Sequence, residues 1–101
     1  MAIGDKKIVR LTSGEELLAT ITKSRKGEFT TGLKDVAIII PQEQNVGLMH
    51  FAPYTTLVET KRDAVLEIDD RHIMFMMDPV DGLVQHYDKM FGKIIAPKFE
   101  V

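Results

Sequence analysis

A short polar loop in the first third of the chain holds the residues best suited to bind a nucleic acid. Ser24-Arg25-Lys26-Gly27 has the composition of a turn, and Phe29 lies two residues beyond it. Cationic side chains attract phosphates, and an aromatic ring offers a base a surface on which to stack. Arg25, Lys26 and Phe29 are therefore candidate nucleic-acid-binding residues. The same residue types equally suit an ordinary solvated hairpin tip.

A second aromatic residue and the charge distribution bear on the same question. Tyr54 follows Pro53 directly and is a further stacking candidate, although a surface aromatic in that position also suits a role in fixing a turn. The net charge is −2. Residues 1–36 hold seven basic and five acidic residues, whereas residues 37–101 hold six and ten. This balance disfavours general nucleic-acid binding and leaves a basic patch only in the first third.

No arrangement of residues in the sequence indicates catalysis or metal binding. The chain has no cysteine, and His50, His72 and His86 are far apart, without a ligand at metal-binding spacing. Asp69-Asp70 has the character of a turn. Glycine-rich phosphate loops and a G-x-S-x-G motif are both absent from the sequence. We therefore expect a protein that is not an enzyme and that needs no cofactor or metal.

Short β-rich segments separated by turns make up most of the chain. Gly14 supplies the positive φ that a tight turn after the first segment requires, and Gly32 marks a bend inside a longer extended segment. Residues 57–63 are partly apolar and then charged, and their assignment is open. The predicted strands cover residues 7–11, 16–23, 28–40, 46–51, 64–68 and 72–77.

One helix is predicted near the C-terminal end, over residues 79–91. Asp78 is placed to cap it, Pro79 suits the first helical position, and Gly92 suits its end. Apolar residues at helical spacing form one stripe, which must be buried: Val80, Leu83, Val84, Tyr87, Met90 and Phe91. Strands followed by one helix predict a mainly β domain, either a small barrel or a strongly bent sheet.

Length and composition indicate one domain, residues 1–101, with the barrel over about residues 5–77. The chain has no apolar run of roughly 18 residues that would span a membrane. Its first residues carry charge where a signal peptide would be apolar. Together with the absence of cysteine, this favours a cytoplasmic location.

The first third of the sequence resembles the first motif of the Sm-like (LSm) family. The segments IVRLTSGEELLATITKS and GLKDVAII reproduce its order of strand, glycine turn, longer strand, loop and third strand, with Gly14 at the turn glycine. The later segments VGLMHFAPYT and DDRHIMFMMDP, followed by a helix, are most similar to the Sm-like proteins of cyanobacterial tailed phages.

The resemblance implies a small, strongly bent, five-stranded antiparallel Sm-like barrel with a C-terminal helix. Subunits of this family join edge to edge through their fourth and fifth strands and close a ring. The edges here would lie near residues 46–51 and 72–77, with Leu48, His50, Ile73 and Phe75 at the subunit interface. The second of these segments is apolar on both faces, which also suits a central strand of a single subunit.

The resemblance further implies binding of single-stranded RNA around the pore of the ring. The family's RNA site uses an Asp and an Asn after the second strand, and the Asn position falls near Thr30. The site also uses an Arg-Gly pair after the fourth strand. This chain has no such pair, and the nearest segment is Ala52-Pro53-Tyr54-Thr55. Two functions therefore stay open: an RNA-binding or RNA-regulating ring, or an interaction module of the same fold without RNA binding.

Overall fold

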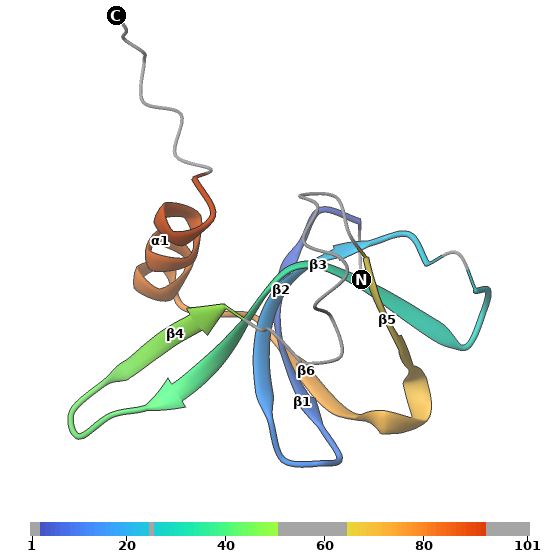
Figure 1. Ribbon diagram of the computed structural model, residues 1–101, viewed down its shortest axis with the longest axis horizontal. Helices are drawn as coiled ribbons and strands as arrows, with labels where there is room; N and C mark the ends of the chain where they lie inside the picture. The colour runs from blue at the N-terminus through green and yellow to red at the C-terminus, as the bar shows by residue number, and fades with distance from the viewer. Residues whose placement is uncertain (1–2, 25, 51–64, 93–101) are drawn as a thin grey trace, which may run out of the picture.

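The computed structural model describes residues 3–24, 26–50 and 65–92, and the prediction of a mainly β chain ending in a helix is confirmed (Figure 1). The uncertain segment 57–63 lies outside the described residues. The elements in chain order are β1 (Lys6–Leu11), β2 (Glu16–Thr22), β3 (Thr30–Pro41), β4 (Val46–His50), β5 (Leu66–Asp69), the 3-10 turn η2 (Asp70–His72), β6 (Ile73–Met77) and α1 (Asp81–Met90).

The strands form one antiparallel sheet in the order β4-β3-β2-β1-β6. The short strand β5 pairs with the first residues of β3, from Thr30 to Leu33. Six strands are therefore present among the described residues, as the six predicted segments indicate and one more than the five that the Sm-like resemblance implies. Within the described residues, β4 and β6 end the path and do not pair with each other, so the sheet is bent but does not close into a barrel over this part of the chain.

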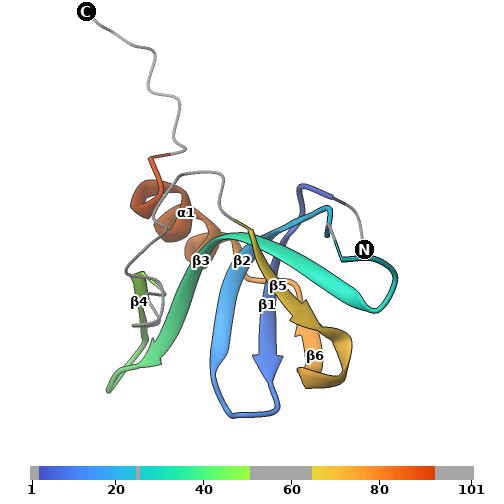
Figure 2. The same cartoon turned by 45° about the vertical axis from the view of Figure 1, so that its right-hand side comes forward.

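The inner face of the sheet encloses the larger of two apolar cores. Val9, Leu17 and Leu33 have no exposed surface there. β5 and β6, joined through η2, wrap around this face, as the two views in Figures 1 and 2 show. They contribute Leu66, Ile68, Ile73 and Met76 to the core. The curvature predicted from the sequence therefore has a physical cause, because a flat sheet would leave this face in water.

The outer face of the sheet is covered by α1. Leu18 and Ala37 lie fully buried beneath Tyr87 of the helix. Leu83, Met90 and Phe91 pack around them, so most of the predicted apolar stripe faces the sheet. β2 is consequently buried on both faces, which explains why its sequence ELLATIT is nearly continuous in apolar and small residues.

A bulge in β3 is fixed by the helix. Asp35 has a φ of +50°, in the left-handed region that Asp tolerates better than most residues. The register between β2 and β3 shifts here, between the pairs Leu18–Ala37 and Thr20–Lys34. The Tyr87 hydroxyl donates to the Asp35 carbonyl over 2.6 Å and lies 2.9 Å from the Thr20 hydroxyl. The bend expected at Gly32 is therefore accompanied by an irregularity three residues later.

The start of the helix differs from the prediction. α1 begins at Asp81 with Val80 in the capping position and no side-chain cap, so Asp78 as the cap and Pro79 as the first helical residue were wrong. The Asp78 carboxylate instead accepts a hydrogen bond from Lys7 on β1. This bond raises the pKa of the Lys7 ammonium group. The ion pair between Asp78 and Lys7 of β1 competes with helix capping, and capping rules, which consider only residues near in sequence, do not reveal it.

We expect Tyr87→Phe to lower the free energy of unfolding by about 1 to 2 kcal/mol at pH 7, because the half-buried Asp35 carbonyl and the buried Thr20 hydroxyl each lose a hydrogen bond to the phenol. Burial also raises the pKa of Tyr87 above its ordinary value of 10.0. As the pH rises, the Tyr87 phenol therefore ionises at a lower pH in the unfolded chain than in the folded protein. The stabilisation by Tyr87 is thus complete below pH 10 and declines as the pH rises through and above that value.

Urea unfolding at pH 7, 9 and 11 tests this expectation. The loss of stability above pH 9 should be smaller in Tyr87→Phe than in the unsubstituted protein. Thr20→Val is the matched control, since it removes the hydroxyl partner but keeps the titrating phenol and should keep the alkaline loss. Identical pH profiles for Tyr87→Phe and the unsubstituted protein would contradict the assigned role.

Candidate functional site

The two ends of the sheet are the most prominent candidate site. Within the described residues, β4 pairs only with β3, from Ala37 to Pro41. In the same part of the chain, β6 pairs only with β1. Each of these strands has five residues and presents one edge to which no described strand is hydrogen-bonded. Such edges expose backbone N–H and C=O groups that can pair with another chain.

Exposed apolar side chains concentrate on these two strands. The described part of the chain has eight exposed large hydrophobic residues, and five of them lie on β4 or β6. The exposed fractions are 41% for Val46, 54% for Met49, 59% for Met74, 39% for Phe75 and 58% for Met77. Apolar surface gathered on both free edges is typical of an interaction surface.

Pairing registers show how these side chains are distributed between the two faces. On β4, Leu48 lies opposite Ile39 and faces the outer core, whereas Met49 lies opposite Ile38 on the inner side. On β6, Met77 lies opposite Ile8 and therefore shares the outer face. Both edges thus carry apolar side chains on both faces, so a partner strand could be covered from both sides.

The four residues predicted at a subunit interface all lie on these strands. Phe75 is exposed on β6, and His50 is exposed at the end of β4, where its ring meets Phe91 edge-on at 4.9 Å. Leu48 and Ile73 are half-buried and pack mainly into the subunit's own cores. The sequence reasoning did not select Met49, Met74 and Met77. The apolar character of both faces of residues 72–77 was a signal for Met74 and Met77 but not for Met49.

The predicted nucleic-acid-binding residues are only partly brought together. Arg25 and Tyr54 lie outside the described residues. Lys26 is exposed, and its backbone N–H donates to Ser24 Oγ and to Glu67 Oε1, 3.0 Å away. Phe29 is 76% exposed, and Thr30 begins β3. The loop is thus tied to β5 through Glu67 and holds its aromatic ring in solvent.

The structure places η2 beside this loop, a neighbour that sequence reasoning missed. The Asp70 N–H donates to the Phe29 carbonyl over 2.9 Å, and Asp70 also accepts from Thr31. Arg71 is exposed, but its guanidinium pairs with Asp69 at 3.0 Å. The hydrogen bond from Arg71 lowers the pKa of the Asp69 carboxyl group. The added cation is therefore largely neutralised by its own turn.

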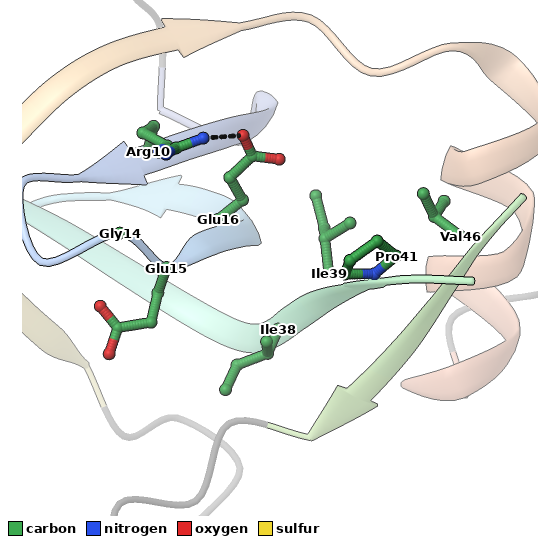
Figure 3. Close-up of a pocket in the computed structure, with 8 residues that line it drawn as sticks. All are labelled: Arg10, Gly14, Glu15, Glu16, Ile38, Ile39, Pro41 and Val46. Atoms are coloured by element: carbon green, nitrogen blue, oxygen red, sulfur yellow. Dashed lines mark hydrogen bonds and ion pairs between the residues drawn. The ribbon is translucent and has the colours of Figure 1, made fainter. Parts of the chain in front are cut away.

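A hollow of about 370 Å³ lies on the sheet between the β1–β2 turn and the β3–β4 hairpin (Figure 3). Arg10 Nη1 donates to Glu16 Oε2 over 2.7 Å at one side of it. Ile39, Pro41 and Val46 form the opposite wall. The titratable residues that line it are Arg10, Glu15 and Glu16, without a nucleophile or a paired general acid and base. The hollow adjoins β4 and extends its apolar surface.

No group of three or more metal-ligating side chains gathers anywhere in the described ranges. Among the same residues, no helix has the length and apolar character needed to cross a membrane. The chain matches no protein-family model and no curated protein sequence. The two edges and the loop beside η2 are the features of the described residues that bear on function.

Proposed function

We propose that the chain is an Sm-like subunit that assembles head to tail, β4 of one copy against β6 of the next, into a closed homo-oligomeric ring. The observation that carries the proposal is the pair of five-residue edges with exposed apolar side chains on both. The two edges differ in sequence and lie at opposite ends of the strand order. A contact between two different surfaces repeats from copy to copy, and it closes when the rotation allows.

Burial of the edges gives the assembly its driving force. A bent sheet of this size keeps much of its surface in water, and apolar side chains such as Met49, Phe75 and Met77 gain free energy when they leave it. Strand pairing between copies also satisfies the backbone groups of both edges. The Sm-like resemblance of residues 7–40 and the edge positions predicted from it agree with this arrangement.

The charge of the exposed loops favours an interaction or assembly module as the role of the ring. In sequence, the loop at residues 24–29 holds Arg25, Lys26 and Glu28, and η2 with its cap holds Asp69, Asp70 and Arg71, so the two segments have equal numbers of basic and acidic residues. Asp69 already pairs with Arg71. A surface that binds the phosphate backbone normally has an excess of unpaired cations. The absence of an Arg-Gly pair from the sequence points the same way.

Binding of single-stranded RNA is the second candidate function. It is favoured by Phe29, whose ring is 76% exposed beside Lys26 in a loop that a ring would repeat around its axis. An aromatic ring held in solvent by a tied loop is a suitable platform for a base. Binding through these residues would weaken with added salt, because the phosphate contacts release counterions.

Native mass spectrometry of protein purified without nuclease treatment tests both functions. We expect an assembly of one defined mass that is free of RNA. The same assembly with co-purified RNA, lost on adding salt and reduced in Phe29→Ala but not in the matched Ile3→Ala, would instead support the second function. A monomer at micromolar concentration would refute the ring.

A further inference from the structure

Three of the exposed apolar residues on the two edges are methionines. Met49 on β4 and Met74 and Met77 on β6 are each more than half exposed. Met76 and Met90 are half-buried, and they pack into the inner and the outer core. The chain therefore separates its described methionines into an edge set and a core set.

We propose that Met49, Met74 and Met77 make the contact between copies sensitive to peroxide, so that their oxidation in the free subunit, where they are exposed, prevents assembly. The proposal rests on the proposed function, because it requires the edges to be the contact. The reagent that these side chains would meet is a small two-electron oxidant such as hydrogen peroxide. Exposed thioethers react readily with it and form sulfoxides that methionine sulfoxide reductases reverse.

The reaction balances without any group from the protein other than the thioether. The sulfur lone pair attacks one peroxide oxygen, the O–O bond breaks, and an S–O bond forms. A proton moves to the departing oxygen, which leaves as water. The methionine sulfur loses two electrons, and the peroxide gains them. Reduction by the reductase system returns the thioether.

The consequence follows from where these side chains lie. In a free subunit Met77 is 58% exposed, so water solvates its sulfoxide oxygen at little cost. At a strand-to-strand contact the same oxygen is placed among apolar side chains of both copies. A buried acceptor without a donor is unfavourable, and the apolar contact of the thioether is also lost. Because both edges carry methionine, every contact in a ring is affected from both sides.

The test uses the full chain and hydrogen peroxide as the probe. The protein is diluted until native mass spectrometry shows free subunits, treated with peroxide, freed of it and then concentrated again. We expect peptide mapping to find sulfoxide at Met49, Met74 and Met77 well before Met76 and Met90. We also expect the protein concentration at half-assembly to rise at least about tenfold, with an unchanged circular dichroism spectrum.

A variant with Met49→Leu, Met74→Leu and Met77→Leu separates the edges from the rest of the chain. Leucine keeps the apolar volume and is not oxidised by peroxide. This variant should therefore assemble, and peroxide treatment should leave its concentration at half-assembly unchanged. Reductase treatment of the oxidised protein should restore its assembly.

The opposing outcomes are distinct. Assembly that survives sulfoxide formation at all three edge methionines overturns the inference and leaves the ring intact. Loss of assembly in the peroxide-treated leucine variant also overturns it, because the edge thioethers are then not the cause. If the untreated protein never assembles, the proposed function fails, and the inference fails with it.

Discussion

A Met49→Lys variant mixed with a Met77→Lys variant is expected to give a heterodimer and nothing larger. Each variant carries one altered edge and one intact edge. Met49→Lys keeps β6 unaltered, and Met77→Lys keeps β4 unaltered. In a head-to-tail assembly the two intact edges can meet only once, and the two altered edges then terminate the complex. Each variant alone should be a monomer.

The size of the effect follows from the burial of an ammonium group. Met49 and Met77 are more than half exposed in the subunit, so a lysine extends into water there and the fold is retained. Neither β4 nor β6 contains an acidic residue, so a lysine placed within a contact between these two strands has no carboxylate partner on them. Leaving a charge buried without a partner costs about 3 to 5 kcal/mol, which weakens association by about a hundredfold or more.

Analytical ultracentrifugation and native mass spectrometry of the single variants and of the mixture provide the measurement. Ile3→Lys is the matched control, because Ile3 is 67% exposed and lies outside both edges. It should assemble as the unsubstituted protein does. If Met77→Lys alone still forms dimers while Met49→Lys does not, β4 pairs with itself, and the head-to-tail geometry is wrong.

Elements whose signal is local could be predicted from the sequence. The alternation in residues 16–23, the turn at Gly14 and the apolar stripe from Leu83 to Phe91 each determine local structure within a few residues. The structure confirms the strand β2, a φ of +109° at Gly14 and a helix that packs on the sheet. The strands predicted near residues 46–51 and 72–77 are also present, and β4 and β6 end the strand order, whereas their pairing between subunits stays a prediction.

Features that depend on contacts between distant segments could not be predicted in the same way. Asp78 has the residue type of a helix cap, but Lys7, 71 residues away in the chain, binds its carboxylate. The bulge at Asp35 is held by Tyr87, 52 residues further on. Neither partner is visible to capping or turn rules, which act over a few residues.

The candidate site shows the same division. Phe29 and Lys26 were selected because their types and their spacing suit a nucleic acid. Arg71 was not selected, because it is far from Phe29 in the sequence. The hydrogen bond from the Asp70 N–H to the Phe29 carbonyl brings η2 beside Phe29 in the fold. The exposure of Met49 and Met77 depends on which strands end the sheet. An apolar residue on a central strand and one on an edge strand have the same sequence signature.

Gly32→Ala is expected to destabilise the subunit by about 2 to 3 kcal/mol. Gly32 lies on β3, opposite Thr22 of β2 and Glu67 of β5, and is thus enclosed between two strands. A Cβ atom there would stand 2.9 Å from the Thr22 carbonyl oxygen and 3.0 Å from that of Lys23. These are backbone atoms, so relief requires a shift of the strand end and of the loop that follows it.

Gly82→Ala is the matched control for that substitution. Gly82 lies in the first turn of α1, is exposed, and would offer a Cβ atom no contact within 4 Å. Alanine favours helix over glycine, so this variant should gain about 0.5 to 1 kcal/mol. Thermal unfolding at one fixed protein concentration, below that at which copies associate, compares the two without a contribution from assembly. Equal stability of Gly32→Ala and the unsubstituted protein would mean that the β2–β3 pairing can move apart at its end.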